Sequence, residues 1–345
     1  MSNELPFLTA DLPGIGGRIK SSPEHFSVEE IPLYPPLGEG DHLYMGIVRE
    51  GWTTRAVQQK LARLFDVKDA DVGYAGMKDR QARVAQTFSL CLPGVDPEDA
   101  LERARAHLPF DAAFAVRHAT KLRTGQLAGN RFGILVVDAV PDALDRARRI
   151  AEAAAPSGLP NYFGEQRFGM RGDNARAGRA ALEGRGPRDR WKRRLFLNAF
   201  QSELFNVWLA ERIRRGAFRE IFAGDVAKTS DTGGLFLVGD PKAEEARFAA
   251  GEIAVTGPVY GSRMWWAEGE PGVLEREILA EADVTEQMFE GARLEGTRRP
   301  AQVLMGDLAI EPRPEGLHFS FVLGKGSYAT SLLREFMKSG VALSS

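Results

Sequence analysis

The sequence predicts an α+β protein, in which helices and strands alternate without a regular strand–helix–strand repeat. Two observations lead to this prediction. Helical spacing of apolar residues and strand-like alternation are interleaved along the whole chain, with no internal repeat or low-complexity tract. The chain has 345 residues, 43% of them hydrophobic, which is enough for two domains with their own cores.

The first part of the chain carries one helix signal and two strand signals. Apolar residues at helical spacing predict a helix that contains Val57, Leu61, Leu64 and Phe65. Thr53 or Thr54 is a suitable N-cap for this helix. Alternation over residues 87–92 predicts a strand in which Cys91 is a small buried side chain. Alternation over residues 132–136 predicts a second strand.

The later part of the chain continues the mixture. A helical stripe over residues 144–154 ends at Pro156 and Gly158, and an aromatic helix is expected over residues 195–213. Residues 317–323 alternate strongly, as expected of a strand, and residues 324–327 form a turn. A final helix should then present the side chains of Tyr328, Leu332 and Phe336, with Leu333 and Met337, on its apolar face.

The middle of the chain differs in texture and is a candidate second domain. Residues 161–299 are rich in Gly and Arg and contain turn sequences such as residues 231–234. Residues 185–194 (RGPRDRWKRR) are strongly basic and contain a tryptophan. Such a run is either a solvated helix face or a surface for the phosphates of a nucleic acid.

Composition narrows the function classes. No run of about 18 apolar residues is present, and residues 1–11 are acidic and lack the features of a signal peptide. The single cysteine excludes an internal disulfide and a thiolate zinc site, so we expect a cytoplasmic protein. The net charge of −2 argues against indiscriminate coating of nucleic acid, although a local basic cleft remains compatible with it.

Common cofactor and catalytic patterns are absent. The five histidines are scattered without metal-ligand spacing, so no metal site is expected. The glycines of residues 14–17 lack the spacing of a dinucleotide-binding loop, and residues 324–327 match only part of a phosphate-binding loop. No Ser-containing nucleophile elbow is present.

The most informative stretch is residues 73–82, GYAGMKDRQA, which places Asp79 between Lys78 and Arg80. Its two glycines allow a bend and close approach of a ligand. Cations that lie near a carboxylate favour its ionised form, which can act as a base or nucleophile. Taken alone, the stretch also fits an ordinary surface turn.

Several ordered blocks resemble the TruD family of tRNA pseudouridine synthases over nearly the full length of the chain. The blocks are residues 17–26, 38–43, 75–86, 129–132, 161–169, 201–206 and 324–335. The block at 161–169, NYFGEQRFG, is the most specific of them. Two positions depart from the family pattern: Val84 stands where Thr is common, and Gly324 where Pro is usual. The first departure removes a hydroxyl that could support the Asp79 loop, and the second loosens a turn.

The resemblance implies a pseudouridine-synthase core with a mixed, mostly antiparallel sheet and flanking helices, plus an inserted α/β domain. The core would consist of residues 1–157 and 303–345, and the insertion of residues 158–302.

The resemblance also implies a reaction and a site. The enzyme would isomerise uridine 13 of tRNA to pseudouridine as a monomer, with tRNA as partner and with no cofactor, metal or membrane. Asp79 falls on the catalytic aspartate, and Phe26, Asn130 and Tyr328 fall on substrate-binding positions. We expect three further residues on the substrate side: Lys20 and Arg167 as partners of Asp79 or of a phosphate, and Phe132 as an aromatic that stacks on a base.

The role of Asp79 and two alternative functions stay open at the level of sequence. Asp79 could attack a carbon of the sugar or of the uracil, or remove the 2′ proton. One alternative is a pseudouridine synthase of broader RNA specificity, and another is a non-catalytic RNA-binding protein on the same scaffold. An unrelated glycosidase is disfavoured because such enzymes generally need two carboxylates, and no second one is evident beside Asp79.

Overall fold

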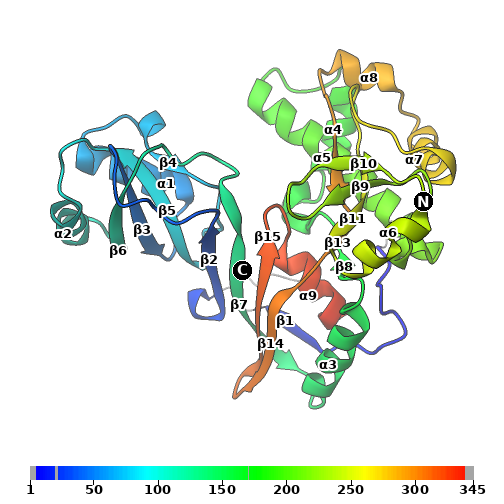
Figure 1. Ribbon diagram of the computed structural model, residues 1–345, viewed down its shortest axis with the longest axis horizontal. Helices are drawn as coiled ribbons and strands as arrows, with labels where there is room; N and C mark the ends of the chain where they lie inside the picture. The colour runs from blue at the N-terminus through cyan, green and yellow to red at the C-terminus, as the bar shows by residue number, and fades with distance from the viewer. Residues whose placement is uncertain (1–4, 20–21, 170, 339–345) are drawn as a thin grey trace. The chain divides into compact units, whose positions relative to one another are not determined.

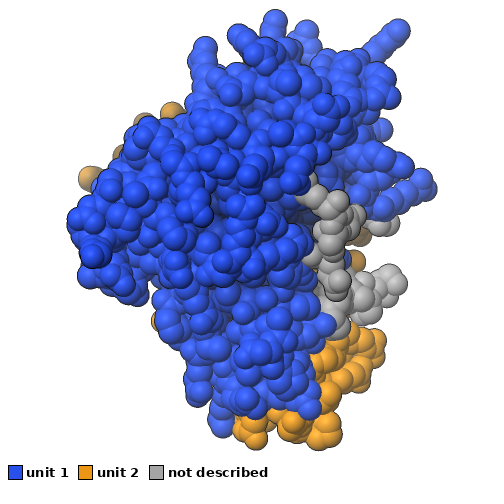
Figure 2. All heavy atoms as spheres, turned by 90° about the vertical axis from the view of Figure 1, so that its right-hand side faces the viewer, with its two compact units in different colours: residues 1–14, 146–304, 327–338 blue, residues 15–145, 305–326, 339–345 orange. Residues whose placement is uncertain are grey.

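The computed structural model describes residues 5–19, 22–169 and 171–338. The chain divides into two compact units, which Figure 2 colours separately. Unit 1 comprises residues 1–14, 146–304 and 327–338, and unit 2 comprises residues 15–145, 305–326 and 339–345. Each unit is therefore assembled from segments that lie far apart in the sequence (Figure 1).

Unit 2 is built on a large twisted sheet with the strand order β14-β15-β7-β2-β5-β3-β6, to which β1 adds on β7 and β4 on β5. The strands are β1 (Gly16–Ile19), β2 (Phe26–Pro32), β3 (His42–Arg49), β4 (Gly73–Tyr74), β5 (Arg83–Cys91), β6 (Asp111–His118), β7 (Leu127–Ala139), β14 (Gly306–Arg313) and β15 (Gly316–Gly324). Among the described residues, β2 and β5 are parallel and the other paired strands of this sheet are antiparallel. The sheet is thus mixed and mostly antiparallel, as predicted.

Helices and short turns complete unit 2. They are η1 (Pro23–His25), α1 (Thr54–Phe65), η2 (Asp69–Asp71) and α2 (Pro97–His107). The apolar face of α1 packs with the side chains of β3 and β5 in one buried cluster. Each fully buried aliphatic side chain of such a cluster contributes about 1.5–3 kcal/mol relative to exposure. Thr53 caps α1 by accepting a hydrogen bond from the Ala56 N–H at 3.1 Å.

Unit 1 is mainly helical, with two small sheets. Its helical elements are η3 (Glu165–Phe168), α4 (Asn174–Leu182), α5 (Arg190–Arg214), η4 (Ala217–Arg219), α6 (Pro241–Ala249), α7 (Gly269–Glu281), α8 (Glu286–Gly291) and α9 (Ala329–Met337), and most of α3 (Ala143–Ala154) belongs to it. Its sheets are β8 (Leu159–Pro160) with β13 (Gln302–Val303), and the order β10 (Leu235–Leu237), β9 (Val226–Thr229), β11 (Ile253–Val259), β12 (Thr297–Pro300). The long helix α5 supplies Phe205 and Trp208 to a buried apolar cluster that also includes Tyr260 and Phe289.

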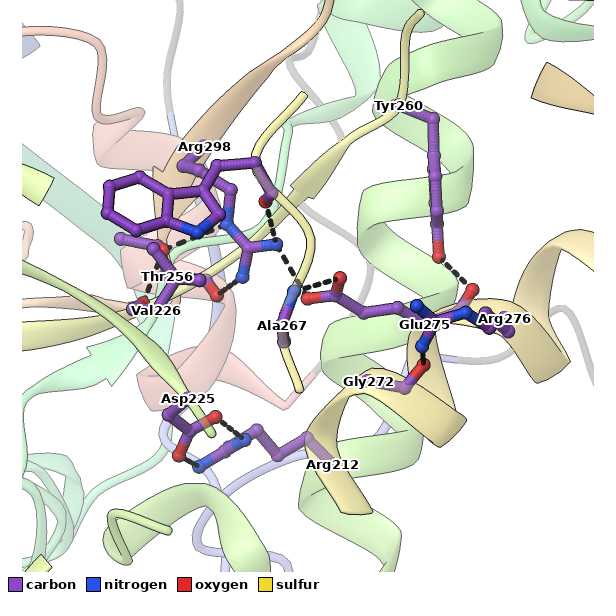
Figure 3. Close-up of polar contacts among 11 residues, drawn as sticks. Arg212, Asp225, Val226, Thr256, Tyr260, Ala267, Gly272, Glu275, Arg276 and Arg298 are labelled. Carbon is purple, nitrogen blue, oxygen red and sulfur yellow. Dashed lines mark hydrogen bonds and ion pairs between the residues drawn. The ribbon is translucent and has the colours of Figure 1, made fainter. Parts of the chain in front are cut away.

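Buried ion pairs bind the parts of unit 1 together (Figure 3). Arg298 on β12 donates to the Glu275 carboxylate on α7 at 2.7 Å, and both side chains are 1% exposed. Arg212 on α5 makes two hydrogen bonds of 2.8 Å to the carboxylate of Asp225. Burial raises the pKa of Glu275, and the charge of Arg298 opposes this change. Removing one partner of such a pair typically costs about 3–5 kcal/mol because an uncompensated charge stays buried.

The helix and strand predictions are confirmed for the elements that we expected. The helix signals correspond to α1, α3, α5 and α9, and the strand signals to β5, β7 and β15. The turn sequence at residues 231–234 joins β9 to β10. One prediction about burial is wrong: Cys91 is exposed, because it is the last residue of β5 and alternation no longer determines burial there.

The expected domain boundaries at residues 157/158 and 302/303 stay a prediction. Compact units are defined by which segments pack together, whereas an inserted domain is defined by where it interrupts the sequence of the core domain. Residues 5–14 and α9, for example, belong to unit 1 by packing although they lie near the two ends of the sequence.

Candidate active site

The loop that carries Asp79 spans residues 75–82 in unit 2, between β4 and β5. Ala75 and Ala82 are each 1% exposed and anchor its two ends, whereas Met77 in the middle is 65% exposed. Gly73 permits tight packing, because an added Cβ atom there would lie 2.2 Å from the Leu122 carbonyl oxygen. Gly76 faces open space and has no left-handed backbone, so only one of the two glycines is required sterically.

Three side chains from neighbouring elements hold the backbone of this loop. The Thr54 hydroxyl, in the first turn of α1, accepts a hydrogen bond from the Lys78 N–H at 2.9 Å. Gln86 on β5 donates to the Gly76 carbonyl at 2.7 Å and accepts from the Thr54 hydroxyl at 3.2 Å. Arg49 donates to the Asp79 carbonyl at 3.3 Å. The loop is therefore held by these side chains at Gly76 and at the Lys78–Asp79 step.

Arg49 is a buried cation that contacts the backbone of this loop. Its side chain lies at the end of β3, 1% exposed, and its guanidinium also donates to the Trp52 carbonyl and to the Thr54 hydroxyl. Burial lowers the pKa of Arg49 to about 10, and the negative charge of Asp79 acts in the opposite direction. The charges of Arg49 and Asp79 therefore attract each other within unit 2.

Asp79 itself is partly exposed, so its carboxylate is accessible to a ligand. Its Oδ1 atom accepts a hydrogen bond from the Gln81 N–H at 3.2 Å, which closes an Asx-type turn. This local bond fixes the direction of the carboxylate relative to the loop. Arg80, by contrast, donates to the Gly51 carbonyl at 3.0 Å.

Lys78 makes an ion pair with a carboxylate that the sequence analysis missed. Its ammonium lies 3.0 Å from the Glu30 carboxylate, and the two side chains are 6% and 4% exposed. The same ammonium donates to the Asn130 side-chain oxygen at 2.5 Å. Glu30 could have been suspected from its position in β2, two residues after buried Val28 on the same face of the strand.

Strand register brings the remaining unit 2 residues onto one face of the sheet. In the β2–β7 ladder, Glu30 is opposite Asn130 and Val28 is opposite Phe132. Alternation places Phe26 on that same face. The rings of Phe26 and Phe132 meet edge to face at 6.5 Å, and Phe132 stacks on Phe321 at 5.6 Å. Phe132 is only 8% exposed, so it supports Phe26 rather than offering an open stacking surface.

Tyr328 and Arg167 belong to a second cluster, which lies in unit 1. The Tyr328 ring is 6.2 Å from that of Phe163, and the Arg299 guanidinium lies 4.1 Å above the Phe163 ring. Arg167 approaches the same ring at 5.5 Å and donates to the Ser202 hydroxyl at 3.0 Å. Burial lowers the pKa of Arg299 to about 10. The cluster joins aromatic rings with guanidinium groups, a combination suited to bases and phosphates.

The predicted site residues are therefore found in two groups. Asp79, Asn130, Phe26 and Phe132 lie in unit 2, and Tyr328 and Arg167 lie in unit 1. Lys20 lies outside the described residues. Four contributors had no assigned role at the level of sequence, namely Glu30, Arg49, Thr54 and Arg299. Only Glu30 has a local signal, its place on the face of β2 that carries Val28. Arg49, Thr54 and Arg299 have none, because their roles depend on contacts with segments that are distant in the chain.

The basic segment at residues 185–194 consists of the loop before α5 and the first turn of that helix, in unit 1. Asp189 caps the helix by accepting a hydrogen bond from the Lys192 N–H at 2.7 Å. Trp191 is 74% exposed, and Arg188 and Arg190 on either side of the cap are exposed as well. An exposed indole among cations is a surface that can contact both bases and phosphates.

Two searches of the described residues were negative. Within residues 5–19, 22–169 and 171–338, no group of three or more His, Cys, Asp or Glu side chains could hold a metal ion. Over those same stretches of chain, we find no helix with the length and apolar character needed to cross a bilayer.

Comparison with known proteins gives a consistent result. The model of the family "tRNA pseudouridine synthase D (TruD)" matches residues 3–186 and 189–336. A tRNA pseudouridine synthase D of Anaeromyxobacter dehalogenans (strain 2CP-C) is 43% identical over 349 residues, which cover 99% of this chain and 98% of the relative. A counterpart in Thermus thermophilus is 43% identical over 334 residues, which cover 96% of this chain and 92% of that relative.

A solved structure has a similar fold. The crystal structure of a candidate tRNA pseudouridine synthase D (TruD) from Methanosarcina mazei superimposes with a TM-score of 0.79. The match covers 97% of this chain and 96% of that chain, at 23% sequence identity. At that identity the likeness supports the fold alone.

Proposed function

The chain belongs to the TruD family of tRNA pseudouridine synthases, and we propose that it converts uridine 13 of tRNA to pseudouridine with Asp79 as the catalytic carboxylate. The observation that carries the proposal is the support of the Asp79 loop. Thr54, Gln86 and Arg49 fix its backbone, and the carboxylate is left partly exposed. A surface turn has no need of buried side chains that hold its backbone in one place.

The reaction is an isomerisation and its atoms balance without a co-substrate. The N-glycosidic bond between uracil N1 and the C1′ atom breaks, the base turns in its pocket, and a bond forms between C5 and C1′. The proton that leaves C5 is replaced by one on N1. The target base must leave its stack to reach a carboxylate, so the site has to supply replacement contacts for that base.

We assign the contacts to the remaining residues of the two groups. Phe26, supported from behind by Phe132, packs on or beside the flipped nucleotide. Asn130 hydrogen-bonds it, and Tyr328 provides a further aromatic surface. Arg167, with Lys20, binds phosphate. The exposed cations around the start of α5 contact the tRNA backbone.

The first test replaces the carboxylate. Asp79→Asn keeps an oxygen that can accept the Gln81 N–H, so the loop should stay folded, but the amide can act neither as base nor as nucleophile. We expect binding of unmodified tRNA within about twofold of wild type and loss of pseudouridine formation. Asp71→Asn, which removes an exposed carboxylate of the same unit, is the matched control. Turnover by Asp79→Asn would contradict the assignment.

The second test addresses the position. An unmodified tRNA transcript and a transcript with cytidine at position 13 are incubated with wild-type enzyme, and pseudouridine is mapped at nucleotide resolution. We expect product at position 13 of the first transcript and none in the second. Product at other positions would indicate broader RNA specificity, and binding without any product would indicate a non-catalytic RNA-binding protein.

The chemical role of Asp79 is tested separately with tRNA that carries deuterium at the 2′ carbon of the target. If Asp79 removes this proton in a rate-limiting step, single-turnover rates fall by a primary isotope effect. Equal rates would favour attack by the carboxylate on carbon.

A further inference from the structure

The contact with Lys78 determines the orientation of the Asn130 amide. An ammonium group has three donors and no acceptor, so the amide atom 2.5 Å from the Lys78 Nζ is the carbonyl oxygen. The Asn130 NH2 group, with its two donors, must then point the other way. Asn130 therefore offers hydrogen-bond donors and no acceptor to whatever lies in front of it.

The Lys78 ammonium is held by Glu30, a residue of strand β2. It lies 3.0 Å from the Glu30 carboxylate, and Glu30 is directly opposite Asn130 in the β2–β7 ladder. The second Glu30 oxygen accepts the Thr87 N–H at 3.4 Å. With side chains only 6% and 4% exposed, this pair has little freedom to reorganise.

The other end of Lys78 is fixed as well. Its backbone N–H donates to the Thr54 hydroxyl at 2.9 Å, so main chain and ammonium are anchored to different elements. The side chain thus spans from the Asp79 loop to the sheet. Because Lys78 is bonded at its backbone and at its ammonium, its side chain has much less conformational freedom than a surface lysine.

We propose that Glu30 and Lys78 are positioning residues that lock the Asn130 amide as a donor to a carbonyl oxygen of the target uracil. The inference rests on the proposed function, because it takes Asn130 to contact the flipped base. Uracil carries two such acceptors, at C2 and C4. A contact to the C4 carbonyl would also disfavour cytosine, because cytosine presents an amino group at C4.

The test uses a neutral variant of the pair, so that no buried charge is left alone. Glu30→Gln with Lys78→Met removes both charges at similar volume, and a melting curve checks that it folds. We expect kcat/KM to fall about tenfold because the amide is no longer locked or polarised. Asp307→Asn, which removes the exposed ion-pair partner of Arg131 in the same unit, is the control for loss of an ion pair.

A mutant cycle distinguishes positioning from general support. In an Asn130→Ala background, the same double substitution should lower kcat/KM by no more than about twofold, because its effect passes through the amide. Additive losses, or unchanged activity of the double variant, would overturn the proposal. Absence of pseudouridine formation by the wild-type enzyme would instead count against the proposed function itself.

Thio-substituted targets identify the acceptor. Sulfur accepts hydrogen bonds more weakly than oxygen, so tRNA with 2-thiouridine or 4-thiouridine at the target should react more slowly with wild type for one of the two. That penalty should vanish in Asn130→Ala. If neither substitution couples to Asn130, the amide donates to no base carbonyl and the proposal is wrong.

Discussion

At the scale of single residues, the charged neighbours of Asp79 have other roles than the sequence suggests. The Lys-Asp-Arg run predicts two cations beside the carboxylate, but the Lys78 ammonium pairs with Glu30 and Arg80 donates to a backbone carbonyl. Arg49, which lies far away in sequence, is a cation on which the negative charge of Asp79 acts. Adjacent side chains in an extended loop point in different directions, so sequence neighbours need not be spatial partners.

The structure also shows the surroundings of the two residues that depart from the family pattern, Val84 and Gly324. Val84 is fully buried and lies opposite Arg49 in the β3–β5 ladder. The hydroxyl that holds the Asp79 loop is supplied by Thr54, so the loop does not depend on a hydroxyl at position 84. Gly324 ends β15 in the register opposite Gly129, where an added Cβ atom would meet open space.

Thr54 therefore offers a residue-scale prediction. Thr54→Val keeps the shape but leaves the Lys78 N–H, Arg49 and Gln86 without their shared partner. We expect a loss of stability of about 1–3 kcal/mol, and a lower kcat as the loop loosens. Thr54→Ser retains the hydroxyl and should stay close to wild type in both measurements. Chemical denaturation and single-turnover kinetics on tRNA give the two values, and a fully active, fully stable valine variant would refute the role of this hydroxyl.

At the scale of elements, α9 is stapled to the N-terminal segment of unit 1. The Glu335 carboxylate accepts hydrogen bonds from both the N–H and the hydroxyl of Thr9 at 2.8 Å, and Lys338 pairs with it at 2.6 Å. Arg334 stacks over Phe7 at 4.0 Å. These contacts fix the helix whose N-cap is Tyr328, so they determine where that aromatic ring is held.

The contacts of Glu335 predict that stability decreases from wild type to Glu335→Gln to Glu335→Leu. Glu335→Leu leaves the Thr9 N–H without its acceptor and removes one acceptor from the Thr9 hydroxyl and from the Lys338 ammonium. It should lower the melting temperature, at a cost of about 1–3 kcal/mol. Glu335→Gln keeps an acceptor oxygen and should lose less. Differential scanning calorimetry measures both variants beside wild type. If leucine is tolerated as well as glutamine, the hydrogen bonds of this carboxylate do not stabilise α9.

At the scale of the whole molecule, positive charge is concentrated in one segment although the net charge is slightly negative. The formal net charge is −2, yet Arg188, Arg190 and Trp191 are exposed together around the start of α5. No ion pair joins Arg188 or Arg190 to an acid within the parts of the chain that the structure describes. Such a surface can bind phosphates although the protein as a whole is slightly acidic.

Charge reversal tests this surface. Arg188→Glu with Arg190→Glu should weaken tRNA binding and reduce the slope of log K against log salt by up to about 2, since each lost phosphate contact accounts for about 0.7–0.9. Lys242→Glu, at an exposed position of α6, lowers the net charge by 2 rather than by 4, so the two variants are compared per reversed charge. Binding titrations between low and moderate salt provide both slopes. Equal affinity and equal slope would mean that this face is only solvated.

Sequence patterns are sufficient to predict the mixed fold class, several helices and strands, and the loop around Asp79. These features follow from periodicity and from residues that are close together in the chain, such as the apolar stripe of α1 and the alternation of β15. Tertiary structure decided that Lys78 meets Glu30 and Asn130, that Thr54 holds the loop, and that Cys91 is exposed. Those facts depend on strand register and on where each element ends, because contacts between distant segments form only when the whole sheet has assembled.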